Sequence, residues 1–286
     1  MKITLEMIKE LRKKTQSGMM NCKQALEHTQ GDMDKAVAYL KEKGMITANK
    51  KKDKVSAEGL TNVAFKGNKA VLFEINSETD FVAKNEHFIA LLEQLKNSLL
   101  DADASVKTVE DFLNYHWNGQ RVKNIILDKA AIIKEQIVLK RIQTVYKKDN
   151  ESFGLYKHQG GKISALVHFD KQNKEAQTHI PIHVAGFNPK FLSKEAVDPN
   201  FIKTEKQLFL EKTINEKAKQ NLPSGLLDKI ASDRLNKVLE EICLLEQHFY
   251  NDTDQKVKEF LQANQKTNVI AYYRFEVGET AEKNEQ

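Results

Sequence analysis

Cysteine is scarce in this chain of 286 residues, which contains only Cys22 and Cys243. Each lies within a stretch of helical periodicity, and the two are far apart in the sequence. This arrangement fits buried, reduced thiols better than a disulfide framework or a cysteine-based metal knuckle. We therefore expect no redox chemistry.

Long hydrophobic runs are also missing. The first 14 residues mix charged side chains through the apolar positions, and no long apolar stretch follows. A signal peptide and a membrane-spanning helix both require such a stretch. The sequence predicts a soluble, cytoplasmic protein that does not associate with membranes.

Sequence signatures of catalysis are absent as well. The chain has no G-x-x-x-x-G-K-[ST] phosphate loop and no G-x-S-x-G nucleophile elbow. Gly160-Gly161-Lys162 could cradle an anion, but glycines in a hairpin turn more simply supply positive φ angles. His179 and His183 have the spacing of two zinc ligands on a helix, yet Pro181 lies between them and no third ligand accompanies them. We predict no catalytic residue, metal or cofactor, and a zinc metalloenzyme is one alternative.

Charge of one sign does not dominate the chain. The net charge of +5 arises from many charges of both signs, and the one basic run is Lys50–Lys54. This balance predicts a mild preference for acidic partners. The run could bind RNA, but the aromatic signature of an RNA-recognition sheet is missing and a solvated linker explains the run more simply. Direct nucleic-acid binding is therefore the main alternative rather than our prediction.

The first 46 residues are predicted to form three short helices. Asn21 with Gln24 is a predicted capping pair for the second helix, while Asp32 can cap the third and Gly44 can close it. A lysine-rich linker follows, so we place the first domain at residues 1–54. The prediction depends on apolar stripes at Ile3, Met7, Ile8 and Leu11, then Cys22, Ala25, Leu26 and Thr29, then Met33, Ala36, Val37 and Leu40.

The middle of the chain mixes strands and helices. Alternating residues on both sides of Gly67-Asn68 predict a β-hairpin. Other predicted elements are helices over residues 86–100, around 106–116 and across the repeat from Ile125 to Ile137, and strands at 138–146, 154–158 and 162–169. The fold class is therefore predicted to be α+β.

Two charged amphipathic stretches occupy residues 201–248, separated by Leu222-Pro223-Ser224-Gly225. An antiparallel helical hairpin that projects as an arm, at about residues 195–248, is the natural solution. A last helix around residues 257–261 then precedes a closing strand over 269–277. Its apolar face is predicted to consist of Val269, Ala271, Tyr273, Phe275 and Val277.

The most informative segment is Thr79-Asp80-Phe81-Val82-Ala83-Lys84-Asn85. An alternating strand ends before it and a helical pattern begins after it, so Phe81 belongs to a turn held between two rigid elements. Loops carried on rigid elements are where binding residues concentrate. We predict that Phe81 probes a partner, with the Asp80 carboxylate beside it. The alternative is that Phe81 and Val82 fill the top of the local core.

Gly18-Met19-Met20 is predicted to link the first two helices. Adjacent residues cannot both point into one small core, so we expect at least one of the two methionines to face solvent or a partner. The flexible, polarisable side chain of methionine suits adaptable contact surfaces.

Four groups of residues occur together, in this order, in one known family. They are Leu11-Arg12 and Thr15 with Gly18 to Leu26, Thr79 to Asn85, Tyr156 to His158 with Gly160 to Ile163, and Arg274 to Glu279. Through these residues the chain resembles the elongation factor Ts family of bacterial translation. The resemblance runs from residue 1 to about residue 280 and includes the inserted helical arm.

The resemblance implies an architecture. It comprises an N-terminal three-helix ubiquitin-associated-like domain, a core of two α+β subdomains, a coiled-coil arm and a C-terminal module. On this chain the domains fall at residues 1–54, 55–140 and 141–286, with the arm inside the last. In relatives the region of Pro181 and Gly186 is a continuous helix, so we expect this helix to start late or to kink.

The resemblance also implies a function without covalent chemistry, nucleotide exchange on elongation factor Tu, the GTPase that delivers aminoacyl-tRNA. Thr79, Asp80, Phe81 and Val82 would enter the GTPase near its magnesium site, and His158 would support a second contact. The N-terminal domain would dock through Arg12, Met19, Met20 and Asn21. Oligomeric state varies within the family, so a homodimer through the core or the arm is left open.

Overall fold

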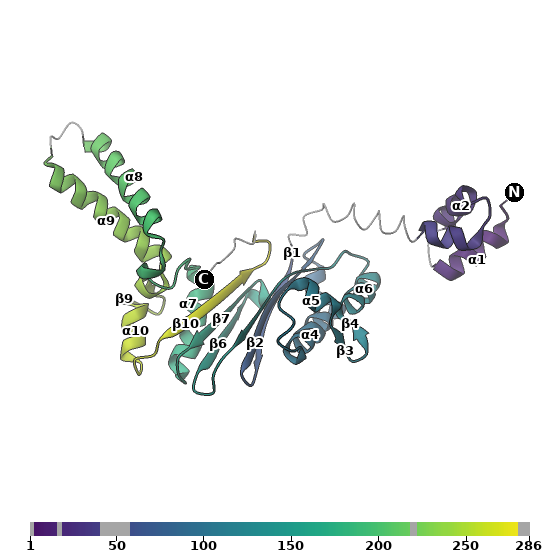
Figure 1. Ribbon diagram of the computed structural model, residues 1–286, viewed down its shortest axis with the longest axis horizontal. Coiled ribbons are helices and arrows are strands. Elements are labelled where there is room, and N and C mark those ends of the chain that lie inside the picture. The colour runs from purple at the N-terminus through teal and green to yellow at the C-terminus, as the bar shows by residue number, and fades with distance from the viewer. Residues whose placement is uncertain (1–2, 16–18, 41–57, 218–221, 280–286) are drawn as a thin grey trace. The chain divides into compact units, whose positions relative to one another are not determined.

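The computed structural model describes residues 3–15, 19–40, 58–217 and 222–279, apart from the side chains of residues 5, 12–15, 19–21 and 217. The chain divides into two compact units, Met1–Val55 and Ser56–Gln286 (Figure 1). No helix in the described ranges combines the length and the apolar character that crossing a membrane requires.

The first unit consists of short helices around a small apolar core. Helix α1 spans Leu5–Thr15, helix α2 spans Met19–His28, and a third helical stretch runs over residues 33–40. The three predicted helices are thus confirmed. Their core is formed by Ile8, Leu11, Cys22, Ala25, Leu26, Ala36 and Leu40.

The predicted ends of these helices are only partly right. Asp32 caps the third helix, since its carboxylate accepts a hydrogen bond of 3.0 Å from the Lys35 amide. The capping pair Asn21 and Gln24 is wrong, because α2 already begins at Met19 and both residues lie inside it. Gly44 is outside the described residues.

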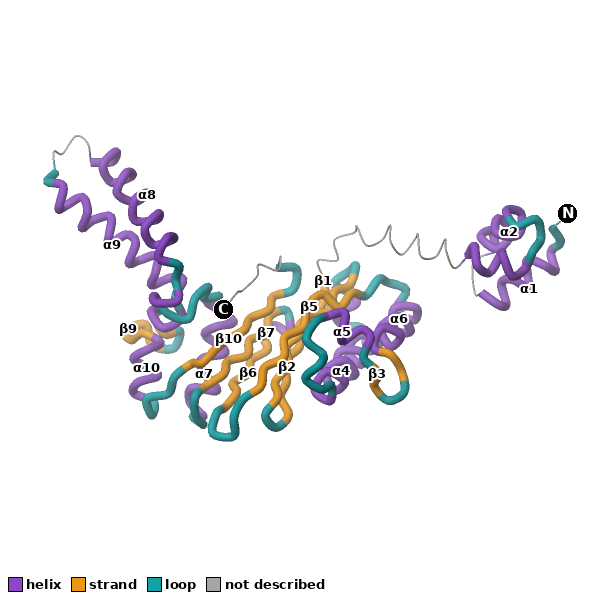
Figure 2. The backbone as a smooth tube through the Cα atoms, viewed as in Figure 1, coloured by secondary structure: helices purple, strands orange, loops and turns teal. Residues whose placement is uncertain are grey.

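The second unit begins with an antiparallel sheet of order β1-β2-β5. Strands β1 (Glu58–Lys66) and β2 (Lys69–Ser77) form the predicted hairpin, and β5 spans Val138–Tyr146 as predicted. Three helices pack on its outer face (Figure 2). They are α4 (Glu86–Asp101), α5 (Val109–Asn114) and α6 (Val122–Ile133), and a small hairpin of β3 (His116–Trp117) and β4 (Gln120–Arg121) precedes α6.

A second antiparallel sheet has the order β10-β7-β6. Strands β6 (Ser152–His158) and β7 (Ile163–Phe169) are joined by the short turn η2 (Gln159–Gly161), and β10 covers Val269–Glu276. Helix α7 (Lys174–Phe187) packs on the outer face of this sheet.

The inner faces of the two sheets pack against each other. Between them lie Val63, Ala70, Leu72, Val145, Phe153 and Leu166, which form one buried cluster. Each sheet is therefore covered on both faces, by helices outside and by the other sheet inside. This explains why every residue of β2 is buried, although its sequence alternates.

The arm is a helical hairpin of α8 (Pro199–Lys217) and α9 (Ser224–Ile242), and it projects away from the sheets (Figure 1). Ion pairs connect Lys206 to Asp228 and Glu216 to Arg234 across the hairpin. The chain then closes through η5 (Leu244–Glu246), β8 (His248–Phe249), β9 (Asp252–Lys256) and α10 (Val257–Ala263) before it enters β10.

Several predicted boundaries need correction. The helix expected around residues 106–116 is shorter, because a capping box at Thr108 starts α5 at Val109 and His116 already pairs in β3. Helix α6 ends at Ile133, because the following residue Lys134 adopts the left-handed conformation, so Ile137 lies beyond the helix.

The apolar face of the closing strand is also corrected. A β-bulge between Val269 and Ala271 shifts the register of β10. Val269 therefore packs with Tyr272 toward α7, whereas Tyr273 and Phe275 pack between the sheets.

Pro181 does not delay helix α7. Asn173 caps the helix by accepting hydrogen bonds from the Glu175 and Ala176 amides, and Pro181 is accommodated inside Lys174–Phe187. The strand beside it carries Gly154, where a Cβ would lie 2.6 Å from the Gln177 carbonyl oxygen and 2.8 Å from the proline Cγ. Gly154 thus lets β6 approach the turn of helix that the proline interrupts.

Candidate functional site

The turn after β2 presents one aromatic side chain to solvent. Phe81 is 80 % exposed and immediately precedes the short turn η1 (Val82–Lys84). Its neighbour Asp80 is also exposed. The Phe81 ring therefore lies outside the core, at the surface of this turn.

This turn is held at both ends. The Glu135 carboxylate accepts hydrogen bonds from the Thr79 amide at 3.0 Å and from the Thr79 hydroxyl at 2.6 Å. The Glu78 carboxylate accepts another from the Gln136 amide at 3.1 Å. On the other side, Asn85 caps α4 through a hydrogen bond of 2.8 Å from the His87 amide. The exposed ring is therefore carried by an ordered backbone.

Val82 fixes the turn from below. It is 5 % exposed and belongs to the core cluster beneath α4. The two sequence interpretations of this segment thus apply to different residues, because Phe81 points outward while Val82 fills the top of the core. Val82 therefore anchors in the core the turn that carries Phe81.

His158 stands at the end of β6, immediately before the turn η2. Its Nδ1 atom lies 3.1 Å from the Tyr156 hydroxyl. Gly160 and Gly161 have φ angles of 67° and 107°, as expected for glycines in this turn. The turn packs on β1, where the Thr61 hydroxyl donates a hydrogen bond of 2.7 Å to the Gly161 carbonyl oxygen.

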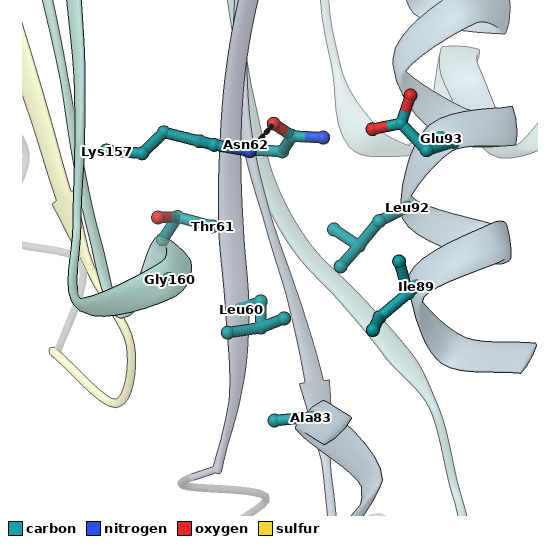
Figure 3. Close-up of a pocket in the computed structure, with 9 residues that line it drawn as sticks. All are labelled: Leu60, Thr61, Asn62, Ala83, Ile89, Leu92, Glu93, Lys157 and Gly160. Atoms are coloured by element: carbon teal, nitrogen blue, oxygen red, sulfur yellow. Dashed lines mark hydrogen bonds between the residues drawn. The ribbon is translucent and has the colours of Figure 1, made fainter. Parts of the chain in front are cut away.

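A pocket of about 160 Å³ lies between the two turns (Figure 3). Ala83 lines it from the Phe81 side and Gly160 from the His158 side. Leu60, Thr61 and Asn62 of β1 separate these two walls, and Ile89, Leu92 and Glu93 project from α4. Lys157 completes the lining and donates a hydrogen bond of 3.2 Å to the Asn62 side chain. The structure therefore brings the Phe81 and His158 segments to opposite sides of one surface hollow.

Two residues of this surface were missed by sequence reasoning. Glu135 lies 56 positions after Thr79, and no local pattern connects them. Ile89 is 47 % exposed on α4 although it directly follows the buried Phe88. The sequence does contain a signal for Ile89, because this residue is apolar but lies outside the apolar stripe of its helix.

The predicted contacts of the first unit are only partly described. Arg12 lies in α1, and Met19, Met20 and Asn21 lie in the first turn of α2, so the methionines belong to the helix rather than to a link. The side chains of these residues are outside the described part of the structure. The basic run Lys50–Lys54 is outside it as well.

The histidines of the zinc alternative have other partners. His179 lies 2.7 Å from the Tyr250 hydroxyl, and His183 Nε2 lies 2.9 Å from the Gln247 side-chain oxygen. The Tyr250 amide donates to His183 Nδ1 at 3.3 Å. Burial lowers the pKa of His183. Within the described residues no group of three or more histidine, cysteine, aspartate or glutamate side chains could hold a metal ion.

The matches to known proteins described here all belong to one family. A family model described as Elongation factor TS matches residues 78–279. An Elongation factor Ts from Phytoplasma australiense is 46 % identical over 277 residues, covering 97 % of this chain and 99 % of that protein. An Elongation factor Ts from Acholeplasma laidlawii (strain PG-8A) is 45 % identical, with coverage of 99 % and 95 %. One from Spiroplasma citri is 39 % identical, with coverage of 100 % and 96 %.

Proposed function

Because the chain belongs to the elongation factor Ts family, whose members are nucleotide exchange factors of translation elongation, we propose that it binds elongation factor Tu in the cytoplasm and promotes release of GDP and Mg²⁺. GTP then binds the emptied GTPase. The observation that carries the proposal is the 80 % exposed Phe81 on a turn anchored by Glu135 and Val82.

The exchange needs no covalent step. A factor that binds the nucleotide-free GTPase more tightly than the loaded one weakens GDP binding by the same factor, since coupling between two sites is reciprocal. Mg²⁺ requires near-ideal octahedral coordination, so a small displacement of its surroundings costs much of its affinity. The residues of this chain therefore only have to displace the surroundings of the Mg²⁺ ion and stabilise the displaced state.

We assign this displacement to the side chain of Phe81. An aromatic side chain buried at the centre of an interface is commonly worth about 2 to 4 kcal/mol, and 2 kcal/mol corresponds to a coupling of about thirtyfold. Asp80, exposed beside the ring, would position the wedge or repel negative charge. Thr79 and Val82 hold the backbone from which the ring projects.

The remaining predicted contacts are assigned by family membership. His158 would support a second contact at the η2 turn, on the opposite side of the pocket from Phe81. The first unit would be a ubiquitin-associated-like domain that docks through Arg12, Met19, Met20 and Asn21. The helical hairpin α8–α9 would serve as the coiled-coil arm, and a one-to-one complex is sufficient for this mechanism.

The test is the rate of fluorescent GDP release from purified elongation factor Tu, followed by stopped flow in the absence of RNA. We expect strong acceleration by this protein and a loss of at least about tenfold with Phe81→Ala. A matched control is Phe65→Ala, because Phe65 is also exposed, at 51 %, but lies at the other end of β1. The free energy of unfolding should change by less than about 0.5 kcal/mol in Phe81→Ala. Absence of acceleration by the unmodified protein would refute the proposed function.

A further inference from the structure

A buried ion network joins the two sheets at the segment Arg274–Glu279. Its centre is Glu74 of β2, whose side chain is fully buried. The Glu74 carboxylate accepts hydrogen bonds from Arg141 Nε at 2.6 Å and from the Gly278 amide at 3.1 Å. Lys140 Nζ lies 3.4 Å away. Residues 204 positions apart in the sequence thus meet at one carboxylate.

A β-bulge makes this convergence possible. In the pairing of β2 with β5, Glu74 faces Arg141 but Ile75 faces Leu139, so Lys140 is the extra residue. Consecutive residues of a regular strand point to opposite faces, whereas a bulge redirects side chains. Both Lys140 and Arg141 therefore reach Glu74.

The network continues into the second sheet. Arg141 donates to the Glu276 carbonyl oxygen at 2.9 Å, and its guanidinium lies 4.0 Å from the centre of the Phe275 ring. Lys140 donates to the Glu279 carbonyl oxygen at 2.6 Å. Glu279 also pairs with Arg274, which donates to the Ala185 carbonyl oxygen of α7 at 3.1 Å. We call Glu74, Lys140, Arg141, Arg274, Glu276 and Glu279 the inter-sheet clamp.

The clamp lies at the end of the sheets that carries the candidate site. Glu74 is the direct cross-strand partner of Thr61, whose hydroxyl bonds to Gly161 and to the Ser164 hydroxyl at 2.7 Å each. In the second sheet, both His158 and Glu276 pair with Ile163 of β7. Glu276 of the clamp therefore lies in the same cross-strand row as His158, with β7 between them, and strand β2 of the clamp leads directly into the Phe81 turn.

The chemistry of the clamp suits positioning more than stability. Apolar side chains fill most of the layer between the sheets, and a buried ion network generally stabilises no better than such packing. Charge-assisted hydrogen bonds are directional, however, and fix the relative placement of the groups they join. Apolar packing and the hydrogen bonds of Thr61 and Lys157 also join the sheets, and the clamp adds directional bonds at Arg274–Glu279 that further restrict the distance between the two turns.

We propose that the inter-sheet clamp is a positioning device that fixes the Phe81 turn relative to the His158 turn, so that elongation factor Tu engages both at once. This inference rests on the proposed function. With a fixed spacing, the first contact makes the second effectively intramolecular, and the second then adds its full contribution to affinity. Without the clamp, the His158 contact contributes less.

A double-mutant cycle tests this. The protein concentration that gives half-maximal acceleration of GDP release is measured for the unmodified chain, His158→Ala, Glu74→Gln and the double variant. His158→Ala should raise this half-maximal concentration by a factor that is at least about threefold smaller in the Glu74→Gln background than in the unmodified chain. Equal factors in both backgrounds would mean that Glu74 acts only through general stability, and would overturn the proposal. A His158→Ala variant without effect would also overturn it, since no second contact would remain to be positioned.

Two further variants make the cycle decisive. Glu151→Gln is the matched control, because Glu151 is a buried carboxylate of the same layer, 2.8 Å from His168, at the other end of β6. Glu151→Gln should leave unchanged the factor by which His158→Ala raises the half-maximal concentration. If Glu74→Gln fails to fold, Glu279→Gln replaces it, because this side chain is 34 % exposed at the rim of the clamp. An unmodified chain that fails to accelerate release refutes the proposed function itself, which is a different outcome from equal factors.

Discussion

Two adjacent glycines in the η2 turn should respond very differently to the same substitution. Gly160 has φ 67° and ψ 13°, and a Cβ built there would meet nothing within 4 Å. Gly161 has φ 107°, and its Cβ would lie 2.8 Å from the Thr61 carbonyl oxygen. That oxygen belongs to the backbone of β1 and cannot rotate away.

The expected magnitudes follow from these geometries. Alanine in the left-handed region costs about 1 to 2 kcal/mol, which is the whole effect expected for Gly160→Ala. Gly161→Ala adds a clash with backbone and requires the turn to move away from β1. It would then lose the hydrogen bond from the Thr61 hydroxyl, about 1 kcal/mol more. We expect Gly161→Ala to destabilise the second unit by about 3 to 5 kcal/mol.

The measurement is urea unfolding followed by the fluorescence of Trp117, the single tryptophan, which lies in the second unit. Gly161→Ala should lower the free energy of unfolding by at least about 2 kcal/mol more than Gly160→Ala. Losses that agree within about 0.5 kcal/mol would refute the reasoning, because the contact with Thr61 would then carry no energy.

Three other predictions concern single side chains. Val82→Ala should lower the free energy of unfolding by about 2 kcal/mol, since Val82 is buried in the core, and Trp117 fluorescence in urea measures this loss. A loss as small as that of Phe81→Ala would contradict the placement of Val82 in the core and Phe81 at the surface. Because burial lowers the pKa of His183 below 6.5, the unfolded chain takes up that proton first, so stability should fall by up to about 1.4 kcal/mol per pH unit as pH drops below about 6.5. Urea midpoints at two pH values should show a smaller decrease in His183→Gln, and an identical decrease would exclude this cause. Cys243 is buried with its pKa raised to about 11, so iodoacetamide at neutral pH should modify it only in urea, as peptide mass spectrometry can show; labelling of the folded chain would be inconsistent with that burial.

Local patterns predicted most of the elements correctly. The β1–β2 hairpin depends on alternation around Gly67-Asn68, and the exposed Phe81 depends on its place between a strand and a helix. Both signals lie within about ten residues of sequence, where backbone preference and periodicity act directly. The same reasoning could not separate Phe81 from Val82, because the direction of each side chain depends on the packing of α4.

Features that depend on tertiary packing were predicted only in part, since helix α7 does not start late and the face of Val269 is wrong. Pro181 is a helix breaker by local preference, yet α7 contains it because Gly154 leaves room beside the interrupted turn and the helix is buried against the sheet. The face of Val269 was misassigned because a bulge changes the side-chain period without any marked change in composition. Tertiary contacts overrode the local signal in both cases.

The clamp is an example of a sequence motif whose structural role is not apparent from the sequence. Arg274, Glu276 and Glu279 read as an ordinary charged end of a strand, and nothing near them in the sequence indicates that they join an ion network. Glu74, which accepts a hydrogen bond from the Gly278 amide between them, lies about two hundred positions earlier, and Lys140 joins Arg141 at this carboxylate only because it forms a bulge. Charged groups are costly to bury unless they are paired, so the fully buried Glu74 and the largely buried Arg141 and Arg274 need a benefit other than stability. A fixed distance between two contact turns supplies one, and it predicts that variants of the clamp fail in affinity for the partner before they fail in folding.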